Sequence, residues 1–167
     1  MSVLVHIPVG VVVERRKAMS PWADFVWQPT AVLPDAPDAA PWTVLKDDGD
    51  RTSFYAGPAI VEFHPTETSH YRENLAAGAQ LWVVLRPTDA EPAYEIARVT
   101  ADPFEGEAFT GAGNDIVESV PMPDSIRQAL EAYVAEHHVE QPFFKRKRDR
   151  GNPEALARRG RVREDDK

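Results

Sequence analysis

The stretch VLVHIPVGVVVER (residues 3–15) decides the class of the fold. Its apolar residues recur at every second position on both sides of Pro8. A period of two places alternate side chains on one face of a β-strand, whereas a helix needs a period near 3.6. The stretch therefore predicts one interrupted strand or two consecutive strands. The alternating residues are Val3, Val5 and Ile7 before the proline, and Val9, Val11 and Val13 after it.

Further strand patterns follow along the chain. Residues 25–33, FVWQPTAVL, are extended in character, and Pro29 indicates an edge strand or a bulge because proline cannot donate to a ladder. Residues 42–57 predict a β-hairpin, since two aromatic and β-branched segments flank the turn residues 47–50. Residues 59–64 predict another strand. The continuous apolar run at 81–85 indicates a central strand that pairs with residues 93–99.

Two short helices are expected between these strands. The first begins at Pro65-Thr66, with Thr66 as its cap, and ends near residue 76 before Gly78. The second has a clear start signature, with Asp102 as the cap, proline at the first helical position and Glu105 three residues after the cap.

The segment PDSIRQALEAYVAEHH (residues 123–138) predicts the longest helix. Ser125 and Gln128 have the spacing of a capping box, and His137 and His138 suit the carbonyls of the last turn. Its apolar stripe makes the helix amphipathic. The face that carries this stripe consists of Ile126, Leu130, Tyr133, Val134 and His137.

Together these patterns predict an α+β fold. We expect a mostly antiparallel sheet of about six to eight strands, two short helices and one longer C-terminal amphipathic helix. Residues 1–144 are predicted to form a single domain. Residues 145–167 lack apolar periodicity and are predicted to be a basic, flexible and disordered tail.

The charge of the chain is divided unevenly. The net formal charge is -8, but residues 145–167 contain ten Lys/Arg and five Asp/Glu, so this tail carries +5 and the body carries -13. A basic tail of this kind can be an interaction arm, can lie on its own acidic body, or can simply be solvated.

Composition excludes several classes of function. The chain has no cysteine, which rules out disulfides, iron-sulfur clusters, thiolate metal ligands and a cysteine nucleophile. No apolar run approaches the roughly 20 residues of a membrane span, and the first residues lack the features of a signal peptide. We therefore expect a cytoplasmic protein that does not bind or enter membranes.

Motifs for catalysis and cofactors are weak. No Gly-x-Ser-x-Gly elbow occurs, and the glycines at 111 and 113 follow a helix without the lysine of a phosphate loop. Glu67 and His70 have Glu-x-x-His spacing, with His64 nearby, but no second copy of the motif exists. We therefore expect no catalytic residue, no cofactor and no metal site.

Residues suited to a partner surface occur in two places. Trp22 follows Arg15 and Arg16 in a loop, and tryptophan with arginine is enriched at protein interfaces. The basic block after two phenylalanines also suits phosphates, but the acidic body repels nucleic acid. An acidic protein surface is the better partner for it. The predicted partner-binding residues are Arg15, Arg16, Trp22, Phe143, Phe144, Lys145, Arg146, Lys147 and Arg148.

Six segments of the chain resemble, in order, a bacterial family catalogued as domain of unknown function 3305. The resemblance spans residues 7–148. Members of that family are typically encoded beside molybdenum- or tungsten-dependent formate dehydrogenase genes and their maturation factors, which implies an accessory role. The segments are IPVGVVVERRK, PWADFVWQPTAVLPDAPDAAPW, ETSHYRENL, LWVVLRP, IVESVPMPDSI and HHVEQPFFKRKR.

The leading expectation is a non-enzymatic accessory protein that binds a formate dehydrogenase subunit or a maturation partner. Two alternatives stay open: an enzyme or carrier that acts on the molybdenum cofactor or its nucleotide, and a protein that binds nucleic acid through the basic tail.

Overall fold

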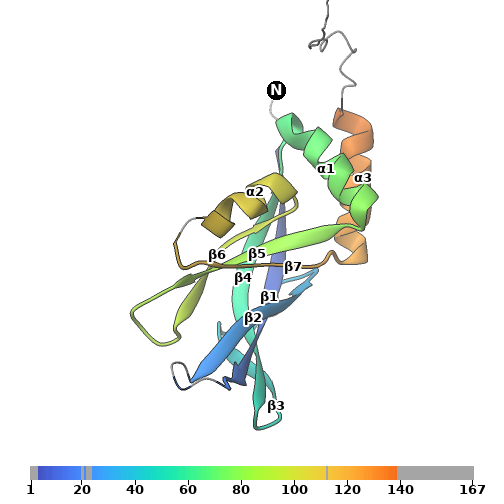
Figure 1. Cartoon of the computed structure of the whole chain (residues 1–167). Helices are drawn as coiled ribbons and strands as arrows, with labels where there is room; N and C mark the ends of the chain where they lie inside the picture. Colours follow the sequence, from blue (N-terminus) through green and yellow to red (C-terminus); the bar gives the residue numbers. More distant parts are fainter. Residues whose placement is uncertain (1–3, 20, 22–23, 112, 139–167) are drawn as a thin grey trace, which may run out of the picture.

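The computed structural model describes residues 4–19, 21, 24–111 and 113–138, and within them it confirms the α+β class (Figure 1). The described residues form seven strands and three α-helices, and short 3-10 turns at Pro65–Glu67 and Phe109–Gly111 adjoin two of the helices. In chain order the elements are β1 (Val5–Lys17), β2 (Phe25–Leu33), β3 (Thr43–Asp47), β4 (Arg51–Phe63), α1 (Thr68–Ala77), β5 (Gln80–Pro87), β6 (Tyr94–Thr100), α2 (Pro103–Ala108), β7 (Ile116–Pro121) and α3 (Asp124–His137).

The strands divide between two antiparallel sheets, where the sequence patterns indicated one. The first sheet has the order β2-β1-β4-β3, and the second has the order β6-β5-β7. The chain leaves β4 through α1 before it returns as β5, which pairs only with β6 and β7 among the described strands. The pairing of β5 with β6 is as predicted. The sheets meet where β4 lies beside β6 and where β2 lies beside β7.

β1 and β4 are the longest strands, with 13 residues each, and they pair along their length. The separate strands predicted on either side of Gly57-Pro58 are wrong, because β4 continues through this dipeptide. Gly57 has a φ of 136°, which glycine adopts without strain, and the register with β1 shifts at this point. β2 is an edge strand whose register shifts next to Pro29, as the proline predicted.

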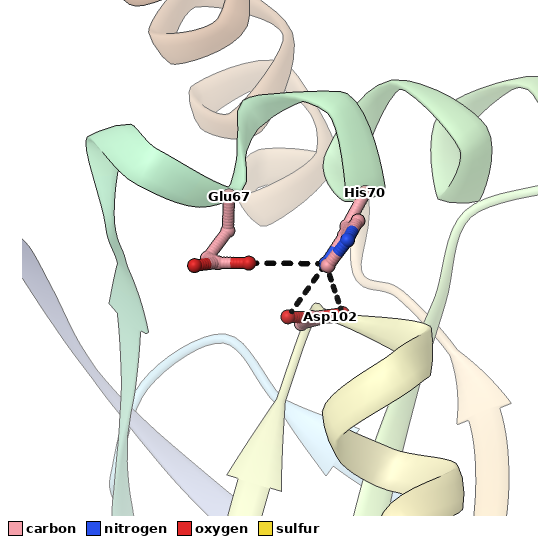
Figure 2. Close-up of side chains that lie close together, drawn as sticks. All are labelled: Glu67, His70 and Asp102. Carbon is pink, nitrogen blue, oxygen red and sulfur yellow. Dashed lines mark hydrogen bonds and ion pairs between the residues drawn. The ribbon is translucent and has the colours of Figure 1, made fainter. Parts of the chain in front are cut away.

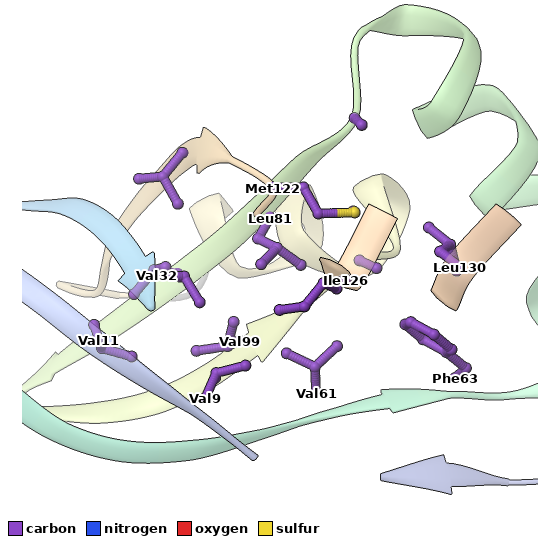
Figure 3. Close-up of a cluster of buried hydrophobic side chains, with 14 of the residues drawn as sticks. Val9, Val11, Val32, Val61, Phe63, Leu81, Val99, Met122, Ile126 and Leu130 are labelled. Atoms are coloured by element: carbon purple, nitrogen blue, oxygen red, sulfur yellow. The ribbon is translucent and has the colours of Figure 1, made fainter. Parts of the chain in front are cut away.

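The core lies between the sheets and α3. Val9, Val11 and Val13 of β1 are fully buried, as their alternation indicates, and Figure 3 shows Leu130 of α3 beside Phe63 of β4. In β5, the successive residues Val83 and Val84 are both fully buried. This strand is therefore covered on both faces, as its continuous apolar run predicted.

α2 begins as the sequence indicates. The Asp102 side chain accepts hydrogen bonds from the backbone N–H groups of Phe104 and Glu105, and Pro103 occupies the first turn. One turn later, Gly106 lies directly against Trp82 of β5: a Cβ atom built on Gly106 would be 2.4 Å from Cγ of Trp82. The short helix can rest on the sheet only because this position lacks a side chain.

The ends of α1 and α3 differ in part from expectation. Gly78, with a φ of 122°, closes α1 as predicted, but Glu67 is the N-cap residue in place of Thr66. The capping box at Ser125 is wrong, since α3 starts at Asp124 and its N-cap, Pro123, has no side-chain hydrogen bond. Proline cannot supply that bond because it has no side-chain acceptor.

His138 joins two helices at the end of α3. Its Nδ1 lies 2.9 Å from Oγ1 of Thr68, and its Nε2 lies 2.9 Å from a guanidinium nitrogen of Arg72. His138 is the C-cap residue of α3, but its backbone N–H binds the carbonyl of Val134 and its side chain links α3 to α1. The sequence patterns gave no prediction for β7, and the predicted tail at 145–167 lies outside the described residues. Within the described ranges, no helix has the length and apolarity to cross a membrane.

Candidate functional site

Two of the predicted partner-binding residues lie together at the far end of β1. Arg15 and Arg16 are both half-buried there, and Arg16 pairs with Val26 of β2 on one side and with Arg51 of β4 on the other. The other predicted residues, Trp22, Phe143, Phe144, Lys145, Arg146, Lys147 and Arg148, lie outside the described residues.

The Arg15 guanidinium rests on a group of aromatic rings. Its central carbon is 4.3 Å from the ring centroid of Phe25, 5.2 Å from that of Phe54 and 5.7 Å from that of Trp27. Trp27 also contacts Trp42 and Tyr94, with centroid distances of 5.8 Å to each. A cation above aromatic faces gains about 0.5–2 kcal/mol, depending on how far it is desolvated. Arg15 therefore has a fixed position on an apolar base.

Apolar side chains remain exposed around this arginine. Phe25 and Val26 on β2 are 37% and 39% exposed, and Val44 and Leu45 on β3 are each 53% exposed. Val44 pairs with Phe54, so both point to the face that carries Arg15. We call Arg15, Lys17, Phe25 and Val44 the Arg15 surface, while Arg16 and its partner Val26 face the other side of the sheet. The Arg15 surface is an apolar area with positive charge on a chain of negative net charge.

A polar pocket lies at the opposite end of β4, between the end of that strand, α1 and the start of α2. Its volume is about 310 Å³. The residues that line it are His64, Thr66, Glu67, Tyr71, Asp102 and Glu105. Three of the six are carboxylates, and the described lining includes no lysine or arginine. The pocket therefore suits a cation or a hydrogen-bond donor better than an anion.

At the edge of this pocket, two carboxylates converge on one histidine nitrogen (Figure 2). Nδ1 of His70 is 3.1 Å from Oε1 of Glu67, and 3.0 Å from both Oδ1 and Oδ2 of Asp102. The side chains of Glu67 and His70 are 35% and 32% exposed, while that of Asp102 is only 10% exposed. Among the described side chains, these three form the group whose ligand atoms could hold a metal ion.

Asn74 fixes α1 next to Asp102. This side chain lies one helical turn after His70 and is only 2% exposed. Its Nδ2 donates to the carbonyl oxygens of Gln80 and Ala101, at 2.8 and 2.9 Å, and its Oδ1 accepts from the backbone N–H of Gln80. Because Ala101 directly precedes Asp102, these hydrogen bonds hold the His70 face of α1 against the start of α2.

Glu105 and His64, which also line the pocket, have polar partners outside the Glu67–His70–Asp102 group. Glu105 accepts hydrogen bonds from Arg98 at 2.6 and 2.9 Å and from Oγ1 of Thr100 at 2.6 Å. Nε2 of His64 lies 3.0 Å from Oε1 of Glu62. Glu105 and His64 therefore already have partners, whereas Glu67 and Asp102 both face His70.

The buried Tyr71 also lines the pocket. Its hydroxyl accepts a hydrogen bond from the backbone N–H of His64, and the residue is 1% exposed. Burial raises the pKa of Tyr71 to about 12, and burial also raises the pKa of Tyr55 and Tyr133. In the folded chain these three phenols remain protonated above the ordinary tyrosine pKa.

Stability is therefore expected to fall between about pH 10 and pH 12. Below the unfolded-state pKa of about 10 the full stability is present, and as pH rises the unfolded tyrosines ionise first. Tyr71 alone then lowers the free energy of unfolding by about 1.4 kcal/mol for each pH unit until the pKa of the folded state is reached. Urea midpoints measured across this range test the effect. Tyr71→Phe should flatten the decline, and a midpoint that does not move with pH would contradict the assignment.

The sequence identified part of this group. Glu67 and His70 stand at the spacing that places them on one helical face, and Asp102 was correctly predicted as a helix cap. The contact of Asp102 with His70, which lies 32 positions earlier, depends on how α1 packs against the start of α2. The aromatic residues beneath Arg15 are separated in the same way along the chain, so only strand register brings them together.

Comparison with known proteins gives one match. A family model described as "Protein of unknown function (DUF3305)" matches residues 8–148, which is most of the chain. No curated protein and no solved structure matches it.

Proposed function

The chain belongs to the DUF3305 family, and on that premise we propose that it is a non-enzymatic accessory protein of the cytoplasm that binds another protein. The partner we propose is a subunit of a molybdenum or tungsten formate dehydrogenase, or one of its maturation factors. The gene neighbourhood typical of the family supports this class of partner.

The Arg15 surface is the observation that carries the proposal. It combines partly exposed aromatic and aliphatic side chains with an arginine that is held in place, which is the composition of the centre of a protein interface. Arg15 is pre-organised on Phe25 and Phe54, so binding would cost little further side-chain entropy.

The charge at this surface defines the partner further. Arg15 and Lys17 lie two positions apart at the end of β1 and therefore share one face, whereas Arg16 and its partner Arg51 lie on the other face. On that other face, Arg51 forms an ion pair with Glu14 at 3.3 Å. The partner surface is therefore expected to have an apolar centre with acidic groups at its rim.

The polar pocket gives less support to a role on the molybdenum cofactor or its nucleotide. Such ligands carry phosphate, and the carboxylates of Glu67 and Asp102 would repel it. Nucleic-acid binding would depend on the basic residues after residue 144, which lie outside the described part of the chain.

Affinity purification of the tagged full chain from its native host tests the proposal. We expect a formate dehydrogenase subunit or maturation factor to be recovered, and deletion of the gene to lower formate dehydrogenase activity. Recovery of the chain alone, together with normal activity after deletion, would exclude this function. Recovery of nucleic acid that is lost as salt rises would favour the tail hypothesis.

The double variant Phe25→Ser/Val44→Ser is expected to reduce recovery of the partner at least about tenfold, because interface anchors each contribute about 1–2 kcal/mol or more. Ile60→Ser is the matched control: Ile60 is also an exposed strand residue, at 47%, but it lies outside the Arg15 surface. Equal recovery with both variants would show that binding does not use the Arg15 surface.

A chain that ends at Gln141 tests the basic tail separately. Unchanged recovery of the partner would mean that the tail is only solvated.

A further inference from the structure

We propose that Glu67, His70 and Asp102 form a binding site for one divalent transition-metal ion at the edge of the polar pocket. The ligand atoms would be Oε1 of Glu67, Nδ1 of His70 and a carboxylate oxygen of Asp102. This site uses residues remote from the Arg15 surface, so it stands independently of the proposed partner.

The first argument is the number of protons available. Nδ1 of an imidazole carries at most one hydrogen, in either its neutral or its charged form. Carboxylate oxygens of both Glu67 and Asp102 nevertheless lie within 3.1 Å of that nitrogen. One N–H group cannot make a well-aligned hydrogen bond to both carboxylates. A metal ion that accepts the nitrogen lone pair can bind all three groups at once.

The second argument is the spacing of the donor atoms. Two neighbouring ligands of an octahedral ion, each about 2.1 Å from it, are about 3.0 Å apart. The nitrogen-to-oxygen separations here are 3.0 and 3.1 Å, and all three ligand atoms lie within 4.8 Å of one another. Small side-chain rotations would therefore be sufficient to admit an ion.

The third argument is that the ligands are held by a second layer of contacts. Oδ1 of Asp102 accepts two backbone hydrogen bonds, and the Asp102 backbone N–H donates to Thr100 at 3.0 Å. The second oxygen of Glu67 accepts a hydrogen bond from Thr66 at 3.0 Å, which leaves Oε1 directed at His70. Supporting contacts of this kind orient metal ligands and raise affinity.

The donor set selects the class of ion. One imidazole with two carboxylates suits zinc or manganese, whereas magnesium prefers oxygen ligands alone. Three protein ligands leave coordination positions for water or an external donor. Glu67 and Asp102 both line the pocket of about 310 Å³, so these positions would face a space large enough for a small ligand.

Titration calorimetry of the tag-free full chain with zinc or manganese chloride tests the site. We expect one ion per chain. Asp102→Asn should weaken binding at least about tenfold, as even supporting residues do in metal sites. Asparagine caps helices as well as aspartate does, so this variant keeps the start of α2. Glu67→Gln should have a similar effect, and His70→Ala should remove binding.

Two variants control for other binding sites. Glu131→Gln removes an exposed carboxylate of α3, and His137→Ala removes a histidine near His138. Both should bind the metal as the unchanged chain does. With manganese, pulsed electron paramagnetic resonance should detect nitrogen coupling that disappears in His70→Ala. Absence of saturable binding, full affinity in both Asp102→Asn and Glu67→Gln, or loss of binding in His137→Ala would overturn the proposal.

Discussion

Replacement of Gly106 with alanine is expected to destabilise the protein by about 3 kcal/mol, at the upper end of the usual cost of overpacking. In an exposed helix the same change stabilises by about 1 kcal/mol, because alanine has less freedom to lose. Here the new Cβ atom would lie 2.4 Å from Cγ, 2.6 Å from Cβ and 2.7 Å from Cδ1 of Trp82. The base of the Trp82 side chain cannot rotate away, so α2 must lift from β5.

Gly111→Ala provides the matched control. Gly111 ends the 3-10 turn that follows α2, and a Cβ atom at this position meets no atom within 4 Å. Urea unfolding should therefore show a lower midpoint for Gly106→Ala and little change for Gly111→Ala. Equal midpoints for both variants would mean that α2 does not rest on Trp82. Because Asp102 caps the start of α2, the Gly106 variant should also bind metal more weakly.

Replacement of Phe63 with alanine is expected to cost about 3–5 kcal/mol, the usual range for a buried phenylalanine. Phe63 is fully buried at the end of β4, and its ring centroid lies 5.8 Å from that of Tyr71 and 5.4 Å from that of Tyr133. It thus joins the first sheet to α1 and α3. A small domain is stable by only about 5–15 kcal/mol, so much of that margin would be lost.

Phe104→Ala controls for the general loss of a phenyl ring. Phe104 is 51% exposed, so its removal should cost less than about 1 kcal/mol. Thermal unfolding followed by circular dichroism compares the two variants. A Phe63 variant that unfolds at the same temperature as the Phe104 variant would contradict the packing of both helices on the end of β4.

Features of the fold with a local cause were predictable from the sequence. The edge position of β2 follows from Pro29, and the start of α2 follows from Asp102, Pro103 and Glu105. Each depends on residues a few positions apart. Gly57 led to the wrong prediction of a strand end, because a glycine at a positive φ can either end a strand or lie within one. Only the pairing with β1 shows that β4 continues through Gly57.

Features that depend on docking were not predictable. The division into two sheets requires knowledge of where β5 pairs after α1, and β7 is recognisable mainly through its pairing with β5. The meeting of Asp102 with His70 depends on Asn74, whose amide binds the backbone of Ala101. Nothing in the sequence near Asn74 marks it as different from other helical asparagines.

The length of β4 has a thermodynamic consequence. The twelve steps from Thr52, opposite Arg15, to His64, beside the pocket, span at most about 40 Å at 3.3 Å for each residue. Val44 and Asp102 lie near opposite ends of this strand, and distant substitutions with no shared partner normally have additive effects on the free energy. A chain that combines Val44→Ser with Asp102→Asn should therefore lose partner recovery and metal affinity by the same factors as the two single variants. A departure from additivity would give the coupling free energy between the two sites.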